Sequence, residues 1–177
     1  MAVKEIILYP DDPLRKKAKP FTKIGPEVQA LAADLFETIE AYDGCGLAGP
    51  QVGILKRIIA VHEHDQDLRL CLLNPEIYAT EGQQVAEEGC LSIPYIYAPV
   101  ARHTCIGVRG LNEHGEPVDF EATGVLARII QHETDHLDGM IFLDRVDVLT
   151  HEAKFREWAE MREQILSELS SGLPHVG

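Results

Sequence analysis

The segment between Thr123 and Leu137 constrains the fold of this chain more than any other stretch. Its apolar residues recur at helical spacing and form one broad face made of Val125, Leu126, Ile129, Ile130 and Leu137. Gly139 follows shortly after the last of them, at a position where helices commonly end. We therefore predict an amphipathic helix whose apolar face points into a core, so the rest of the chain must pack around it.

The chain has 177 residues, of which 45% are apolar and 25% are charged. This length is enough for one domain with a sizeable core and too short for two ordinary domains. No internal repeat or linker divides it, so we predict a single domain spanning residues 1–177. The net charge of −13 repels phosphate backbones, which argues against direct DNA binding. The chain shows neither a membrane-helix nor a signal-peptide pattern, so we expect a cytoplasmic protein without membrane attachment.

The remaining segments show both helix and strand patterns. A helix is expected from Pro26, which suits the first helical position, towards Gly44. β-Branched runs at 57–63 and 68–77 indicate strands, and "HTCIGVRGL" and "PVDFEAT" on either side of "NEHGE" indicate a hairpin. A last helix is expected over about Thr150–Leu169. Together these patterns predict an α+β fold in which antiparallel strands pack around the central helix, with one helix N-terminal and one C-terminal.

The central helix carries the sequence "HETDH", in which His132 and His136 are four residues apart. On a helix this spacing puts both imidazoles on one face, where they can reach one metal ion. Glu133 lies beside them, close enough to take a proton from metal-bound water. A charged, solvated helix end has a similar pattern, but the apolar turns before it indicate a buried helix. Buried histidines need partners, which a metal provides, so we favour a metal site.

The third ligand decides the class of enzyme, because catalytic metal sites usually have three protein ligands. A metzincin would have a histidine where this chain has Phe142, which excludes that class. A thermolysin-like zinc endopeptidase would use a downstream glutamate, and Glu157 and Glu160 lie at a tolerable distance. Cys90, in "EEGCLSIP", offers a thiolate, although a buried free cysteine is the commoner state of this residue type. The residues around the histidines leave these last two options open.

A glycine-rich stretch, "GCGLAGPQ" at 44–51, is the third motif. Its glycines permit close approach of the backbone to a ligand, and Gln51 offers a side-chain donor, although an ordinary loop can look the same. In this order, "GCGLAGPQ", "EGCLS" and "QHETDH" resemble the motifs of peptide deformylases. The resemblance extends over about residues 5–148. Gly49 departs from it, because the family commonly has alanine there, and we expect this glycine to loosen the loop.

The resemblance implies a metal-dependent hydrolase that removes the N-formyl group from the N-terminal methionine of newly made peptides and releases formate. One divalent metal per chain is implied, with the ligands Cys90, His132 and His136. Glu133 is implied as the acid–base group, and the Gln51 side chain and the Leu91 N–H as donors to the developing oxyanion. Fe(II) is the metal implied in the cell, while Zn(II), Ni(II) and Co(II) also suit one thiolate and two imidazoles.

The same resemblance assigns supporting roles to residues near these motifs. The residues expected to bind substrate are Gly46 and Leu47, through their backbone, and Val125 and Ile129, which would line an apolar pocket for methionine. Glu88 and Arg102 are expected to form a buried pair that positions the segment containing Cys90.

The implied partners are N-formyl-methionyl nascent peptides, and a transient ribosome association is also compatible with the resemblance. However, acids outnumber bases in the expected C-terminal helix, which gives no support for basic docking to ribosomal RNA. Two alternatives remain: a zinc endopeptidase that uses Glu157 or Glu160 as its third ligand, and a non-catalytic module that holds formyl-peptides. Retention of Glu133, Gln51 and all three ligands argues against the module.

Overall fold

The computed structural model describes residues 2–171. The ends of the predicted domain, residue 1 and residues 172–177, lie outside the described residues. Within this range the α-helices are α1 (Pro26–Ala41), α2 (Gly124–Leu137) and α3 (Val148–Ser170). The strands are β1 (Gly46–Ala48), β2 (Ile58–Glu63), β3 (Leu68–Glu81), β4 (Gln84–Cys90), β5 (Ile93–Arg102), β6 (Cys105–Leu111) and β7 (Pro117–Thr123). Short 3₁₀ helices at Asp12–Arg15, Gly49–Val52 and Phe142–Arg145 complete the described elements.

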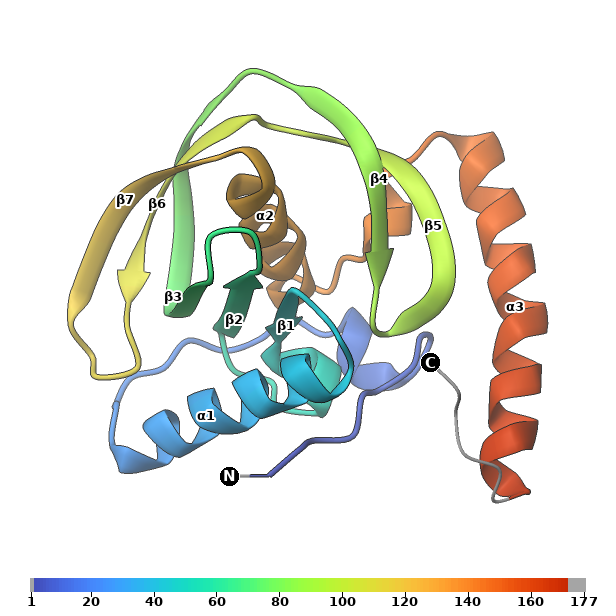
Figure 1. The fold of residues 1–177 in the computed structure, drawn as a ribbon, viewed down its shortest axis with the longest axis horizontal. Helices are drawn as coiled ribbons and strands as arrows, with labels where there is room; N and C mark the ends of the chain where they lie inside the picture. Colours follow the sequence, from blue (N-terminus) through green and yellow to red (C-terminus); the bar gives the residue numbers. More distant parts are fainter. Residues whose placement is uncertain (1, 172–177) are drawn as a thin grey trace.

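The strands form two antiparallel sheets that are joined at one end. The larger sheet has the order β1-β2-β3-β6-β7, and β4 pairs with β5 to form the smaller one. In Figure 1, β3 continues over the top of the molecule into β4, and β5 returns into β6. The turn between β3 and β4 contains Gly82, whose φ of 66° is a conformation that glycine adopts without strain. The small sheet is therefore an extension of the large one, bent towards α2 and α3.

The large sheet lies between α1 and α2, and the alternation of side chains along β2 shows why. Ile58 and Ala60 belong to the cluster that packs against α1, whereas Ile59 and Val61 belong to the cluster that packs against α2. Every residue of β2 is buried, because helices cover both faces of the sheet at this strand. The core of the domain thus places α2 directly behind β1 and β2 (Figure 1).

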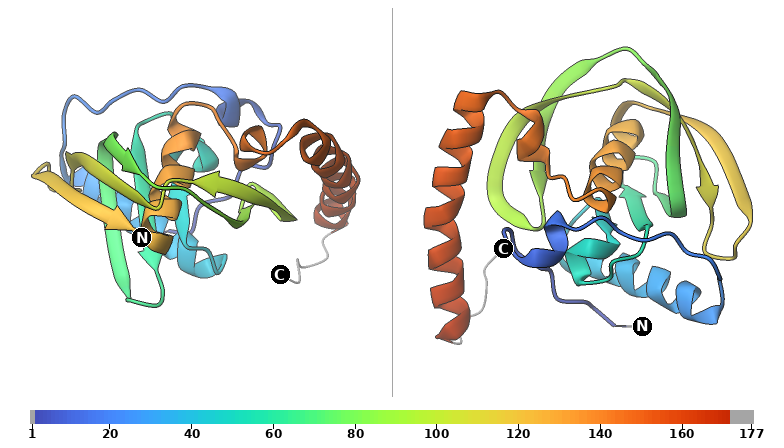
Figure 2. Two further views of the ribbon diagram at one scale, coloured as in Figure 1. Left: turned by 90° about the horizontal axis from the view of Figure 1, so that it is seen from above. Right: turned by 180° about the vertical axis from the view of Figure 1, so that it is seen from behind.

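The C-terminal helix α3 covers the small sheet. Figure 2 shows it beside β5, away from α1 and α2. Trp158 and Ile165 are its two buried side chains, and they pack with Ile96 and Val100 of β5. The Trp158 indole N–H also donates to the Tyr9 carbonyl over 2.9 Å, which ties α3 to the N-terminal segment. This packing supports the hairpin β4–β5, in which Cys90 is the last residue of the first strand.

The structure confirms the predicted α+β class and the three predicted helices, with boundaries shifted by a few residues. It also shows three strands, β1, β4 and β5, that the sequence patterns do not indicate. Val125 was expected to point into the core, but its side chain is 58% exposed, so that prediction is wrong. On a helix of 3.6 residues per turn, Val125 shares a face with His132 and His136 and not with Ile130. Within residues 2–171, no helix is long and apolar enough to span a membrane.

Candidate metal centre

Two elements bring the predicted ligands together. α2 presents His132 and His136 on one face, and both side chains are buried. Cys90 is the last residue of β4, and its Sγ lies 3.4 Å from His136 Nε2. One potential ligand atom from each of the three residues lies within 4.8 Å of the others, the one such group found among the described residues.

This donor set fits one metal ion. A tetrahedral ion with bonds of about 2.0–2.3 Å to nitrogen and sulfur holds neighbouring ligand atoms roughly 3.5 Å apart, close to the sulfur–nitrogen separation at Cys90 and His136. Burial, with a smaller contribution from the nearby Arg102 cation, lowers the pKa of His136 well below its ordinary value, so its ring is neutral and has a lone pair to offer. One thiolate and two imidazoles leave a fourth position open, which is typical of catalytic sites.

A buried ionic network fixes the orientation of His132. Its Nδ1 lies 2.8 Å from Glu88 Oε1, so the opposite ring nitrogen, Nε2, is left to face the ligand position. Arg102 makes a two-pronged contact with Glu88, at 2.9 and 3.0 Å, and its third nitrogen donates to Asp135 at 2.6 Å. Burial opposes the charge on Glu88, but the hydrogen bonds from His132 and Arg102 outweigh it and lower the pKa of Glu88 to about 2. The predicted Glu88–Arg102 pair is therefore present, and it acts directly on a histidine of the site.

Glu133 lies on α2 next to His132 and is 4% exposed. Its side chain fits against the backbone of β1: a Cβ at Gly46 would lie 2.5 Å from Glu133 Oε1, so only glycine leaves room there. The other oxygen, Oε2, is buried without a hydrogen-bond partner among the described residues. Burial raises the pKa of Glu133 to about 7, which suits a group that accepts and then returns a proton near neutral pH.

Gln51 approaches the same point from the 3₁₀ helix that follows β1. Its Oε1 accepts from the Ala48 N–H at 2.9 Å, so the amide nitrogen must point the other way. That nitrogen donates to Cys90 Sγ at 3.4 Å and to Ser92 Oγ at 3.2 Å. Leu91 follows Cys90, and its side chain packs over Gly44. The amide of Gln51 is thus held beside the Cys90 sulfur by the backbone of its own segment.

The backbone near Gly49 is packed more tightly than expected. A Cβ at Gly49 would lie 2.6 Å from the Ile54 carbonyl oxygen and 2.7 Å from that of Lys56. The space that an alanine methyl would occupy is filled by backbone. The glycine therefore permits close packing, and the expectation that it loosens this segment is wrong.

β1 lies at the edge of the large sheet and borders the site. Gly46 pairs with Val61 and Leu47 with Ala60 on the β2 side, and the order of the strands leaves the opposite edge of β1 unpaired. The side chain of Leu47 is fully buried in the core, so its backbone is what faces a ligand. Ile129 is 6% exposed on α2, one turn before His132–Glu133.

Some residues around the site had no signal in the sequence patterns. Arg128 donates to Glu88, and Arg145 makes a two-pronged contact with Asp135, at 2.5 and 2.7 Å. Phe142, which excluded the metzincin class, stacks on the ring of His132 with centroids 6.0 Å apart. Charges on a helix usually indicate a solvated face, and partners this far apart in the chain leave no local pattern. Only the apolar turns of α2 before His132 indicate from the sequence that such charges are buried.

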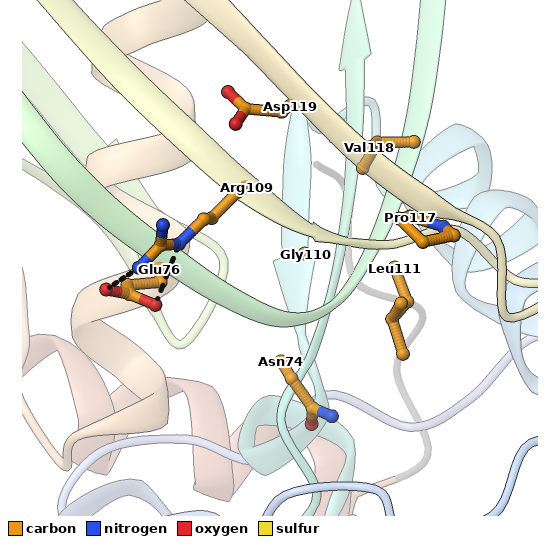
Figure 3. Close-up of a pocket in the computed structure, with 8 residues that line it drawn as sticks. All are labelled: Asn74, Glu76, Arg109, Gly110, Leu111, Pro117, Val118 and Asp119. Carbon is orange, nitrogen blue, oxygen red and sulfur yellow. Dashed lines mark hydrogen bonds and ion pairs between the residues drawn. The ribbon is translucent and has the colours of Figure 1, made fainter.

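Among the described residues, features away from the site form no second group of potential metal ligands. Glu157, a candidate third ligand of an endopeptidase, is exposed on α3 and pairs with Lys154 at 3.1 Å, and Glu160 is also exposed. A hollow of about 340 Å³ lies over β3, β6 and β7 (Figure 3), where Arg109 pairs with Glu76. A polar cavity of about 230 Å³ lies between α2 and the strands, lined in part by Arg102 and Asp135. Neither is lined by any of the three potential metal ligands.

A donor set of one cysteine and two histidines with a buried carboxylate beside it suits a metal-dependent hydrolase. The family model described as polypeptide deformylase matches residues 3–152. The peptide deformylase of Desulforudis audaxviator is 45% identical over 150 residues, covering 84% of this chain and 97% of that protein. That of Clostridium botulinum is 48% identical over 145 residues, covering 82% and 97%.

Solved structures agree with this assignment. A peptide deformylase from Legionella pneumophila superposes with a TM-score of 0.87 at 34% identity, covering 93% of this chain and 98% of that one. One from Synechococcus elongatus, in complex with actinonin, gives 0.83 at 37% identity, covering 88% and 86%. The chain belongs to the polypeptide deformylase family.

Proposed function

We propose that this protein removes the N-formyl group from the N-terminal methionine of newly made peptides and releases formate. The observation that carries the proposal is the convergence of Cys90, His132 and His136 beside the buried Glu133, in a chain of this family. Peptides with a formylated N-terminus are the substrates that the family implies, and hydrolysis of a linear amide is the reaction.

Cys90, His132 and His136 are proposed to hold one divalent metal ion. A cation in this position supplies Lewis acidity, which polarises the formyl carbonyl and makes a water molecule more acidic. A thiolate with two imidazoles suits Fe(II), Zn(II), Co(II) and Ni(II). Fe(II) is our proposal for the metal in the cell, as the resemblance to the family implies.

Glu133 is proposed to move the proton. Its carboxylate takes a proton from the attacking water and returns it to the nitrogen of the leaving amine when the formyl C–N bond breaks. The close approach of Gly46 holds the carboxylate in place, and the unpartnered Oε2 is free to receive the proton. Burial favours the protonated form of this carboxyl, which helps it to keep the proton until the amine leaves.

Gln51 and Leu91 are proposed to stabilise the oxyanion that develops on the formyl oxygen. Because the Ala48 N–H holds the amide oxygen of Gln51, the amide N–H groups are directed towards Cys90 Sγ and Ser92 Oγ, beside the proposed metal position. The backbone N–H of Leu91 is the second donor that we propose. Preorganised donors of this kind are typically worth about 3–4 kcal/mol of transition-state stabilisation each.

The peptide is proposed to bind along the free edge of β1. Backbone groups of Gly46 and Leu47 would pair with the main chain of the substrate as an added strand, which tolerates variation in peptide sequence. Ile129 and the exposed Val125 lie on the face of α2 that carries the histidines, and we propose that they contact the methionine side chain. A cytoplasmic location, where nascent peptides are formed, and a transient contact with ribosomes are parts of the same proposal.

The decisive assay is release of formate from formyl-Met-Ala-Ser by the protein loaded with Fe(II) or Ni(II) under anaerobic conditions. We expect one formate and one free N-terminal amine for each peptide molecule that is hydrolysed. Cleavage of the Met–Ala bond instead would support an endopeptidase. Binding of the peptide without formate release, in protein shown to contain metal, would support a non-catalytic binding module.

A further inference from the structure

Arg128 makes a set of contacts that neither the motifs nor the proposed mechanism uses. Its Nη1 donates to Glu88 Oε2 at 2.6 Å and to the Val100 carbonyl at 2.9 Å, and its Nη2 donates to the Gln84 carbonyl at 2.7 Å. The side chain is only 15% exposed. One guanidinium on α2 thus holds the first residue of β4, a residue of β5 and the carboxylate that contacts His132.

These contacts join the two elements that carry the potential metal ligands. Arg128 lies one helical turn before His132 on α2, and Glu88 lies two residues before Cys90 on β4. Within residues 2–171 the hairpin β4–β5 pairs with no strand of the large sheet, so side-chain contacts help to set its position relative to α2. A planar guanidinium that donates to three acceptors holds the hairpin in one position relative to α2, which a flexible ammonium cannot do.

Glu88 shows how complete the arrangement is. A carboxylate has about four lone-pair sites. Here Oε1 meets His132 Nδ1 and Arg102 Nη2, while Oε2 meets Arg102 Nε and Arg128 Nη1. All four positions are occupied, so the carboxylate has a single orientation. Loss of Arg128 would leave one of these positions empty and remove the hydrogen bonds to two main-chain carbonyls, the part-buried one of Val100 and the exposed one of Gln84.

We propose that Arg128 is a positioning residue for the metal centre: it locks the Glu88 carboxylate and the Cys90 hairpin against α2, and so slows the loss of the metal. The inference rests on the proposed metal site, and it assigns to this arginine a role beyond the Glu88–Arg102 pair. Removal of groups that support metal ligands typically changes metal affinity or activity by about 10–100-fold, and we expect an effect of this order.

The test compares Arg128→Met and Arg128→Lys with the unaltered protein, each loaded with Co(II) under anaerobic conditions. Arg109→Met is the matched control, because Arg109 also makes a two-pronged contact with a glutamate, Glu76, on an exposed part of the sheet. Two quantities are measured: the rate at which a chelator removes cobalt, and the visible absorption of the thiolate–cobalt complex. Melting of each metal-free protein is recorded alongside them.

We expect Arg128→Met to lose cobalt about 10–100-fold faster, with an altered visible spectrum, while Arg109→Met matches the unaltered protein. Arg128→Lys keeps the positive charge but not the planar guanidinium, so its rate of cobalt loss should lie between those of Arg128→Met and the unaltered protein. This variant provides the test if Arg128→Met does not fold. Lower melting temperatures with unchanged cobalt loss and spectra in the Arg128 variants would mean a purely structural role and overturn the inference. No stoichiometric cobalt binding by the unaltered protein would instead overturn the metal centre itself, and this inference with it.

Discussion

The buried carboxyl of Glu133 leads to a prediction about stability that does not depend on turnover. Replacing it by glutamine keeps nearly the same shape but removes the ionisable group. Burial raises the pKa of Glu133 from its ordinary value of 4.5 to about 7 in the folded protein. The metal-free Glu133→Gln variant should therefore be more stable than the unaltered metal-free protein at high pH, and its advantage should shrink as the pH falls.

The sign follows from proton binding. Between about pH 4.5 and 7 the unfolded chain has lost the proton of Glu133 while the folded chain keeps it, so the free energy of unfolding falls as the pH rises. Each pKa unit corresponds to about 1.4 kcal/mol, so the full shift is worth roughly 3 kcal/mol above pH 7. That is a large share of a total stability of about 5–15 kcal/mol. Below about pH 4.5 the carboxyl is protonated in both states, and this contribution disappears.

Urea unfolding of metal-free protein at pH 5 and pH 8 measures the effect directly. The difference in unfolding free energy between Glu133→Gln and the unaltered protein should grow by about 2–3 kcal/mol between the two pH values. Glu157→Gln, at an exposed carboxylate on α3, is the control and should show little change. A difference for Glu133→Gln that is the same at both pH values would falsify the reasoning. With metal restored, the variant should bind it normally but deformylate at least about 100-fold more slowly.

Three further substitutions test the site. Gln51→Ala should lower kcat by about 100-fold or more with little change in bound metal, and an unchanged kcat in steady-state assays would refute its oxyanion role. Cys90→Ala should lose metal by elemental analysis whereas Glu157→Ala keeps it, and the reverse pattern would indicate an endopeptidase site. Gly49→Ala should destabilise the protein by about 1–3 kcal/mol in urea unfolding, since its methyl would meet two backbone carbonyls, and equal stability would contradict that packing.

Sequence patterns predicted the parts of this fold that depend on local periodicity. α1 begins at Pro26, because proline restricts the backbone to angles that suit the first helical position. α2 ends shortly before Gly139, because glycine permits the backbone angles that end a helix. The grouping of Cys90 with the two histidines required resemblance to a family, since nothing local links a strand end to a distant helix. The motifs therefore identified the potential ligands before any fold was known.

The parts that could not be predicted depend on contacts between distant segments. β4, "QVAEEGC", has two glutamates and a single buried residue, so its alternation is weak, and it forms because it pairs with β5. The role of Arg128 could not be predicted from the sequence, because its hydrogen-bond partners lie in other elements. Val125 was misplaced because helical spacing identifies a face but not what covers each turn of it: Val125 is exposed in the first turn of α2, whereas Ile129 and His136 on the same face are buried.

The positions of the ligands along the chain also bear on folding. Between Cys90 and His132 the chain forms β5, β6 and β7, so the potential ligands are far apart in the sequence. Bringing them together in an unfolded chain is entropically costly, so we expect the site to form late in folding. Metal then binds the finished fold and not its precursors, and each tenfold excess of metal over its dissociation constant adds about 1.4 kcal/mol to the stability of the native state.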